Sequence, residues 1–136
     1  MFFKKKETKN NNFQTNICAL LIHAAKIDEN YTEKEEEIIK KTLSKLGLEK
    51  ENISKTIEKA KIIEQNSNQI LDFTREVKYL PEHDKIKIIE SLWSIIYSNK
   101  EADIYETNLM RRLAGLLYID NKTMGDIKEK VKNQNS

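Results

Sequence analysis

A polar stretch of nine residues occurs twice in this chain, 71 positions apart (27 to 98), and it constrains the fold more than any other feature. The first copy is residues 27–35 (IDENYTEKE) and the second is residues 98–106 (SNKEADIYE). An apolar segment precedes each copy and an amphipathic one follows it. The same offset aligns flanking apolar residues: Leu21 with Leu92, Ile22 with Trp93, Ile39 with Met110, and Leu46 with Leu117. We therefore predict two copies of a helix–loop–helix unit.

Helices are the only regular elements that the rest of the sequence favours. Three glycines and one proline in 136 residues leave little material for hairpin turns. Apolar residues recur at helical spacing, and no segment alternates with a period of two. We predict an all-α single domain of about seven helices. The expected ranges are 13–27, from 32 to about 46, 50–65, 69–79, from 81 to about 96, 104–117, and a last helix capped by Asp120.

Two of these predicted helices, 13–27 and 81–96, are apolar on nearly every side. A helix with this pattern is typical of the centre of a fold, whereas the other predicted helices carry only one apolar stripe. Two central helices wrapped by amphipathic ones are therefore expected.

The chain ends differ from this body. Residues 1–12 (MFFKKKETKNNN) are polar and basic without a helical period, which predicts a disordered leader. An alternative is weak contact of this leader with an anionic membrane, through its two phenylalanines and three lysines. The expected domain spans 13–132, and 133–136 form a polar tail. One cysteine, no signal-peptide pattern and no apolar stretch of membrane-spanning length favour a cytoplasmic protein.

Composition and motifs exclude several classes of function. A net charge of +2, with both signs mixed along the chain, does not indicate nucleic-acid binding. No nucleophile–base constellation, phosphate-binding loop or glycine-rich turn occurs, so neither an enzyme nor a small-molecule substrate is predicted. His23 and Cys18 lie in apolar surroundings without a zinc-type cluster, and we expect both to be structural.

The repeated loops carry oxygen-bearing side chains at alternate positions. They are Asp28, Asn30, Thr32 and Glu35 in the first copy, and Asn99, Glu101, Asp103 and Glu106 in the second. Helix capping explains part of this set, because Thr32-x-x-Glu35 and Asp103-x-x-Glu106 both match the capping-box pattern. Acids at these positions also face the positive end of a helix dipole.

Capping does not require the other oxygens, and alternate oxygens in a short loop also suit a hard cation such as Ca²⁺ or Mg²⁺. The loops are not EF-hands, since Glu33 stands where Gly is needed and Ile39 where Glu is needed. The metal ligands that this interpretation predicts are Asp28, Glu35, Asn99, Asp103 and Glu106.

A third interpretation is a docking surface for a protein partner. Residues 28–37 hold six acids and one lysine, a local charge of −5. Such a run is usually a solvated helix start, but against the nearly neutral average it would attract a basic partner or a cation.

The repeated pattern resembles the TerB-like tellurite-resistance family, whose module also forms the N-terminal domain of certain DnaJ-type co-chaperones. In that family each copy has Ala-Asp-Gly, a spacer and Glu. Here Asp28 and Glu35 match in the first copy, whereas in the second Asn99 replaces the Asp and only Glu106 matches. Residues 75–93 resemble the family's link into its fifth helix. The resemblance covers about residues 14 to 131.

This resemblance implies an all-helical domain that gathers its acidic residues on one face, binds a divalent metal there, and takes part in stress response with partners at the inner membrane surface. The sequence lacks the family's Gly after the Asp, and Glu29 and Lys100 would adopt a left-handed turn only at a cost. We therefore predict a non-enzymatic binding or scaffold protein with an acidic loop face, and divalent-cation binding as the alternative.

Overall fold

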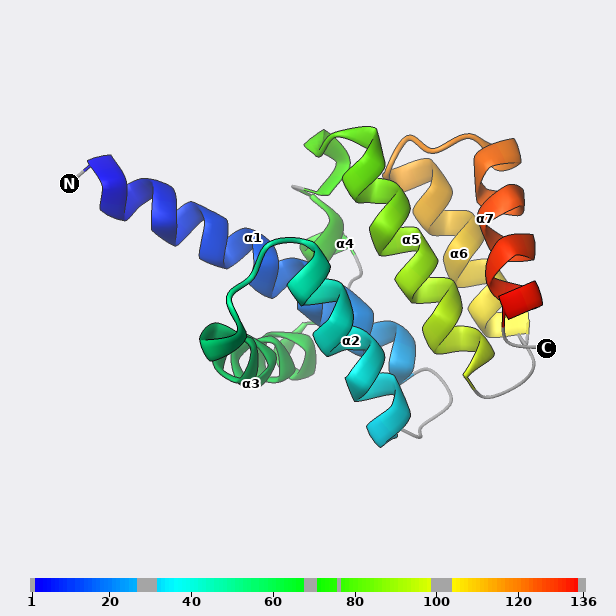
Figure 1. The fold of residues 1–136 in the computed structure, drawn as a ribbon. Coiled ribbons are helices and arrows are strands. Elements are labelled where there is room, and N and C mark those ends of the chain that lie inside the picture. The colour runs from blue at the N-terminus through cyan, green and yellow to red at the C-terminus, as the bar shows by residue number, and fades with distance from the viewer. Residues whose placement is uncertain (1, 27–31, 68–70, 76, 99–103, 135–136) are drawn as a thin grey trace.

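The computed structural model of the protein describes residues 2–26, 32–67, 71–75, 77–98 and 104–134, with side chains from residue 14 onward except at 71, 72 and 104–106. Every regular element in these ranges is a helix, so the predicted all-α class is confirmed (Figure 1). The elements are α1 (Phe2–Ala25), α2 (Glu33–Lys45), α3 (Lys50–Asn66), α4 (Leu71–Thr74), the 3₁₀-helix η1 (Val77–Tyr79), α5 (Glu82–Tyr97), α6 (Ile104–Leu116) and α7 (Asn121–Gln134).

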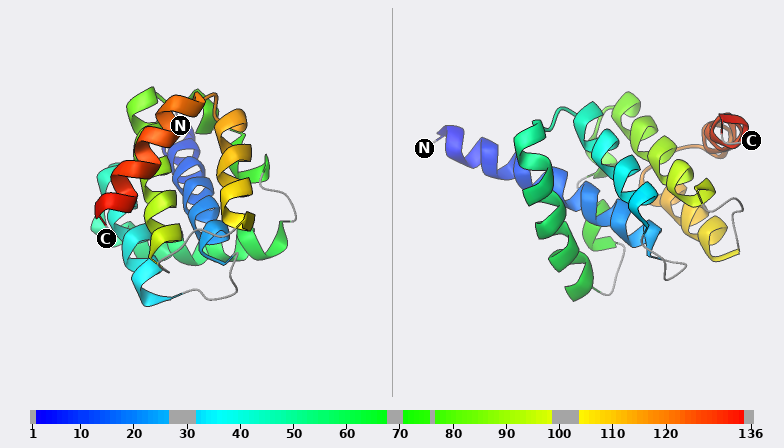
Figure 2. Two further views of the ribbon diagram at one scale, coloured as in Figure 1. Left: turned by 90° about the vertical axis from the view of Figure 1, so that its right-hand side faces the viewer. Right: turned by 60° about the horizontal axis from the view of Figure 1, so that its bottom comes forward.

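Two predicted helices have different bounds in the structure. The first helix was expected to begin near residue 13, but α1 begins at Phe2, so backbone assigned to a disordered leader is helical. No glycine or proline occurs before residue 26 to stop this helix. Figures 1 and 2 show the first half of α1 extending away from the other helices. The predicted helix 69–79 is also wrong, since it is divided into α4 and η1.

The short turn of η1 has a local cause. Pro81 disfavours helical backbone at the residue before it, and the Leu80 N–H closes a tight turn on the Val77 carbonyl at 3.0 Å. Two residues of the predicted helix's apolar stripe are nevertheless buried, because Phe73 is 1% exposed and Val77 is fully buried, while Leu80 is half-buried. The spacing of these residues predicted burial correctly and the continuity of the helix wrongly.

The 71-residue repeat extends over three helices. α2 and α6 begin at Glu33 and Ile104, and α3 and α7 begin at Lys50 and Asn121, so both pairs keep the offset of 71. α3 packs on α1 as α7 packs on α5, and α1 also packs on α5. The first repeat is therefore α1–α3 and the second is α5–α7, with α4 and η1 between them. Sequence comparison of the loops indicated only the first two helices of each copy.

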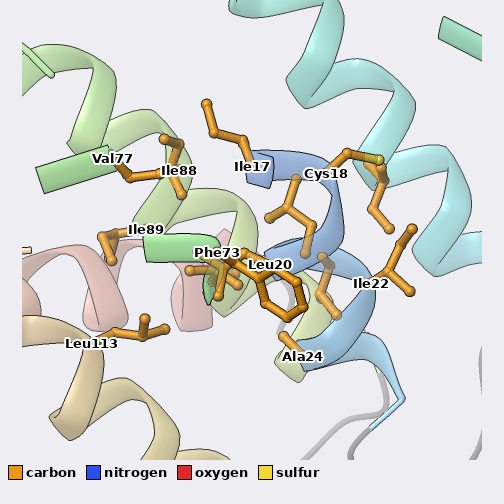
Figure 3. Close-up of a cluster of buried hydrophobic side chains, with 14 of the residues drawn as sticks. Ile17, Cys18, Leu20, Ile22, Ala24, Phe73, Val77, Ile88, Ile89 and Leu113 are labelled. Carbon is orange, nitrogen blue, oxygen red and sulfur yellow. The ribbon is translucent and has the colours of Figure 1, made fainter. Parts of the chain in front are cut away.

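The core lies where α1 meets α5. From Ile17 to Ala25, every residue of α1 except His23 is at most 3% exposed. Figure 3 shows Leu20 of α1 beside Phe73, with Ile88 and Ile89 of α5 and Leu113 of α6 around them. Each fully buried aliphatic side chain of this kind contributes about 1.5–3 kcal/mol. The two helices predicted to be central are therefore the centre of the fold.

Both repeats end their second helix with the same turn. At the end of α2 the Leu48 N–H donates to the Leu43 carbonyl at 3.0 Å, and the Gly47 N–H donates to Ser44 at 3.1 Å. At the end of α6, Ile119 donates to Ala114 at 2.9 Å and Tyr118 to Gly115 at 3.4 Å. These pairs define Schellman motifs, which need a left-handed residue after the helix. Gly47 has φ 97° and Tyr118 has φ 57°.

Candidate functional site

The two repeated loops connect helix ends that lie at one end of the bundle. The C-terminal ends of α1 and α5 and the N-terminal ends of α2 and α6 all lie at the lower end of the view in Figure 1, and Figure 2 shows the same grouping. We name this region, comprising residues 23–26, 32–37, 95–98 and 104–107, the acidic end. The topology therefore brings the helix ends that flank both copies of the repeated motif to one face.

Most of the predicted metal ligands cannot be placed on this face. Asp28, Asn99 and Asp103, together with Asn30 and Glu101, lie outside the described residues. Glu106 belongs to α6, but its side chain is also outside the described part. Glu35 is the one predicted ligand with a described side chain. The proposed ligand set thus stays a prediction.

Glu35 completes the capping box that its spacing predicted. Its Oε1 accepts from the Thr32 N–H at 2.8 Å and from the Thr32 hydroxyl at 3.0 Å, and the Glu35 N–H donates to Thr32 Oγ1 at 3.2 Å. The side chain is 1% exposed. A cation bound by Glu35 would have to share it with this cap, because one carboxylate oxygen already accepts two hydrogen bonds.

Ion pairs connect the acidic end to α3. Lys61 Nζ lies 3.3 Å from Glu36, and Lys26 Nζ lies 2.9 Å from Glu64. The Lys26–Glu64 pair joins the end of α1 to α3, and its carboxylate side is 9% exposed. Two acids of α2 therefore act within the first repeat: Glu35 completes the cap of α2, and Glu36 forms an ion pair with α3.

Two other acids of α2 face solvent. Glu33 and Glu37 are exposed, and neither forms an ion pair with a residue in the described ranges. Glu33 lies in the first turn of α2, where the partial positive charge of the helix terminus favours an acid. These two carboxylates are the exposed acids in the described part of the acidic run, residues 32–37.

Cys18 and His23 of α1 lie in the core and at its edge, as expected. Burial raises the pKa of the Cys18 thiol to about 12, and the Glu36 carboxylate adds to this rise. A thiol with this pKa stays protonated and unreactive near neutral pH. Burial lowers the pKa of the His23 imidazole, against the smaller opposing effect of Glu64. Its ring lies 6.2 Å from that of Phe73.

Among the described residues, no three His, Cys, Asp or Glu side chains are grouped closely enough to hold a metal ion. The donors that the loops offer are carboxylate and amide oxygens, which suit Ca²⁺ or Mg²⁺ better than Zn²⁺.

A hollow of about 150 Å³ lies in the second repeat, between α5, α6 and α7, and sequence analysis did not indicate it. It is lined by Trp93, Thr107, Met110, Arg111, Ala114, Asn121, Met124, Gly125 and Lys128. The Trp93 indole N–H is buried without a hydrogen-bond partner among the described residues. In the first repeat, Leu43 and Ile57 occupy the positions equivalent to Ala114 and Lys128, and both are buried. The hollow therefore lies where the second repeat has a smaller residue, Ala114, and a charged residue, Lys128, in place of two buried apolar ones.

The family model for the tellurite resistance protein TerB matches residues 14–129, which is most of the chain. The chain belongs to the TerB family. This family is not known as a family of enzymes. Neither curated proteins nor solved structures gave a match. In the described part of this TerB-family chain, no helix combines the length and apolar character that crossing a membrane requires.

Proposed function

We propose that this TerB-family protein is a non-enzymatic binding or scaffold protein whose working surface is the acidic end. One observation carries the proposal: the helix ends that flank both loops lie on the same face of the bundle. The chain has two copies of an acidic motif, and the topology presents them together. Glu33 and Glu37 are exposed there, while the cap of α2 is already completed by Glu35.

The partner that this surface suits is a protein with a basic patch. The run 28–37 carries a charge of −5 in a chain whose net charge is +2, so the field at the acidic end opposes the average. Complementary charge mainly raises association rate and selectivity. The name of the matched family points to a tellurite-type stress response as the setting, and we propose that the partner lies at the inner membrane surface.

Charge reversal at the acidic end tests this proposal. The variant Glu33→Lys/Glu37→Lys is compared with Glu51→Lys/Glu58→Lys, which makes the same change of charge at exposed positions of α3. Proteins captured from a membrane-containing extract are quantified for each. We expect a set retained by the unchanged protein and by the α3 control but lost from the acidic-end variant. Identical sets for all three proteins would exclude this surface.

The alternative function is divalent-cation binding by the same two loops, and their shared end of the bundle favours it too. The test is thermal melting of EDTA-treated protein with and without millimolar Ca²⁺, Mg²⁺, Mn²⁺ or Zn²⁺. A cation held at a hundred times its dissociation constant adds ~2.7 kcal/mol, which raises Tm by several degrees. Loss of this shift in Asp28→Asn and in Glu106→Gln would favour the cation. No shift with any of the four ions would exclude it.

Glu35 needs a separate pair of variants, because capping and metal binding both use its carboxylate. Glu35→Gln retains a capping-box side chain but removes the charge, whereas Glu35→Ala removes both. Without cations we expect Glu35→Ala to cost about 0.5–2 kcal/mol and Glu35→Gln to cost much less. Denaturant unfolding measures both. A cation-dependent rise in Tm that disappears in Glu35→Gln would show a ligand role that capping does not explain.

A further inference from the structure

A second hollow, of about 340 Å³, lies between α2, α5 and α7, and the proposed function does not use it. On α2 it is formed by the second half of the helix, from Ile38 to Lys45, and the acidic end is at the other terminus. Its volume falls in the range of pockets that hold small molecules. The lining residues are Ile38, Lys41, Thr42, Lys45, Lys87, Glu90, Ser91, Ser94, Lys130, Val131 and Gln134.

The charges around this hollow have one dominant sign. Four lysines from three helices line it, against a single carboxylate, Glu90. Glu90 is paired with Lys130 at 3.0 Å, and Lys87 lies 4.0 Å from Asp84, at the limit of an ion pair. Lys41 and Lys45 form no ion pair with a residue in the described ranges. The lining therefore keeps a charge of about +3 at neutral pH.

The wall of the hollow between α2 and α5 is polar and fixed in place. The Thr42 hydroxyl donates to the Ser91 hydroxyl across the two helices and lies 2.8 Å from the Ile38 carbonyl of its own helix, while the Ser91 hydroxyl donates to the Lys87 carbonyl at 2.9 Å. Thr42 is 2% and Ser91 is 9% exposed. This contact joins α2 to α5 beside the lysines that line the hollow.

We propose that this hollow binds the phosphate group of a small soluble molecule. An ammonium group is a compact point charge suited to phosphate, and several lysines around one pocket attract a group that carries two or more negative charges. The Ser94 hydroxyl and the Gln134 amide add neutral donors to the wall. The volume exceeds that of a single phosphate, which leaves room for a second phosphate or an organic body.

The experiment is a calorimetric titration of the full chain with inorganic pyrophosphate at low salt. The variant Lys41→Gln/Lys45→Gln removes two lining charges, and the control Lys40→Gln/Lys55→Gln removes two charges from exposed lysines outside the hollow. Lys40 lies next to Lys41 on α2, so the control also removes one charge from that helix. We expect the first variant to bind pyrophosphate at least about tenfold more weakly than the unchanged protein does. The control should bind it with unchanged affinity.

A third variant tests the sign of the effect. Glu90→Gln removes the one lining carboxylate and releases Lys130, so it should strengthen pyrophosphate binding severalfold. Equal weakening by the lining and control variants would mean general attraction to a lysine-rich surface and would overturn the proposal. So would the absence of binding. Binding to phosphatidic acid vesicles without any binding of pyrophosphate would also overturn it, in favour of a lipid headgroup.

Discussion

The two repeats have the same order of helices, 71 positions apart, but their side chains pack differently. In the first repeat, Ile22, Leu43 and Ile57 are branched apolar side chains that are at most 3% exposed. The equivalent residues of the second repeat are Trp93, Ala114 and Lys128, and a hollow of about 150 Å³ lies beside them. The same backbone plan therefore supports one closely packed unit and one with unfilled volume. Four sets of substitutions test this comparison, in order of decreasing effect.

Trp93→Ala should have the largest effect, a loss of about 3–5 kcal/mol, because it removes the largest side chain of the second repeat. Trp93 is 3% exposed and stacks on Tyr97 with a centroid distance of 5.9 Å, while Lys128 Nζ lies 5.4 Å from the centroid of its ring. Urea unfolding measures the loss. The matched variant Ile22→Ala should cost about 2–5 kcal/mol. A Trp93→Ala cost below about 1 kcal/mol would show that α5 is not central.

The two Schellman turns should respond in opposite directions. Gly47→Ala places a side chain at φ 97° and should cost about 1–2 kcal/mol. Tyr118→Gly relieves the same strain at φ 57° and should be about 1 kcal/mol more stable than Tyr118→Ala, in which the strain remains.

The control for the second turn is Tyr118→Ala, which loses the ring but keeps the side-chain strain. The ring of Tyr118 lies 5.9 Å from Lys85 Nζ, a contact worth about 0.5–1 kcal/mol at an exposed site. Subtracting the alanine result from the glycine result therefore isolates the backbone. If Tyr118→Gly gave no gain over Tyr118→Ala, the two turns would not be strained alike.

Ala114→Leu gives the second repeat the residue that the first has at this position. Because Ala114 lines the hollow, a leucine there should fill volume and stabilise the protein by about 0.5–2 kcal/mol in thermal or denaturant unfolding. Loss of about 1–3 kcal/mol instead would mean that the flexible side chains of Met110 and Met124 already use this space.

His23 should produce the smallest effect, and only on the acid side. Burial lowers its pKa below the ordinary value of 6.5, so the unfolded chain binds the proton more readily. The stability is then complete above about pH 6.5 and falls as the pH decreases below it. The equivalent residue of the second repeat, Ser94, carries no such group. His23→Gln should remove a loss of less than about 1 kcal/mol between pH 7.5 and 5. Urea unfolding midpoints at both pH values measure this loss. If the midpoint changed with pH equally in His23→Gln and in the unchanged protein, the prediction would be wrong.

Most of the fold was predictable because it depends on local pattern. Helical spacing identified α2, α3, α5 and α6 to within a residue or two, and the capping-box sequence at Thr32 and Glu35 predicted the start of α2 with its hydrogen bonds. The errors lie where the local signal was weak: the start of α1, which lacks an apolar stripe, and the division between α4 and η1 before Pro81.

The site was less predictable for a different reason. A run of acids in the sequence does not show which carboxylates form contacts within the protein and which stay exposed. Glu36, for example, forms an ion pair only because α3 brings Lys61 next to it. Likewise, the lysines of the second hollow lie on α2, α5 and α7, with up to 89 positions between Lys41 and Lys130. No spacing rule connects residues so far apart.

Local pattern was sufficient to predict the helical class, the repeat and the identity of the two central helices, because hydrophobic period and helix capping act over a few residues. Three further features are evident only in the tertiary structure. It brings together the helix ends that flank both acidic motifs, it extends the repeat to α3 and α7, and it opens a lysine-lined hollow between helices distant in the chain. Each of these depends on how helices pack, and packing is set by contacts between residues that are far apart in sequence.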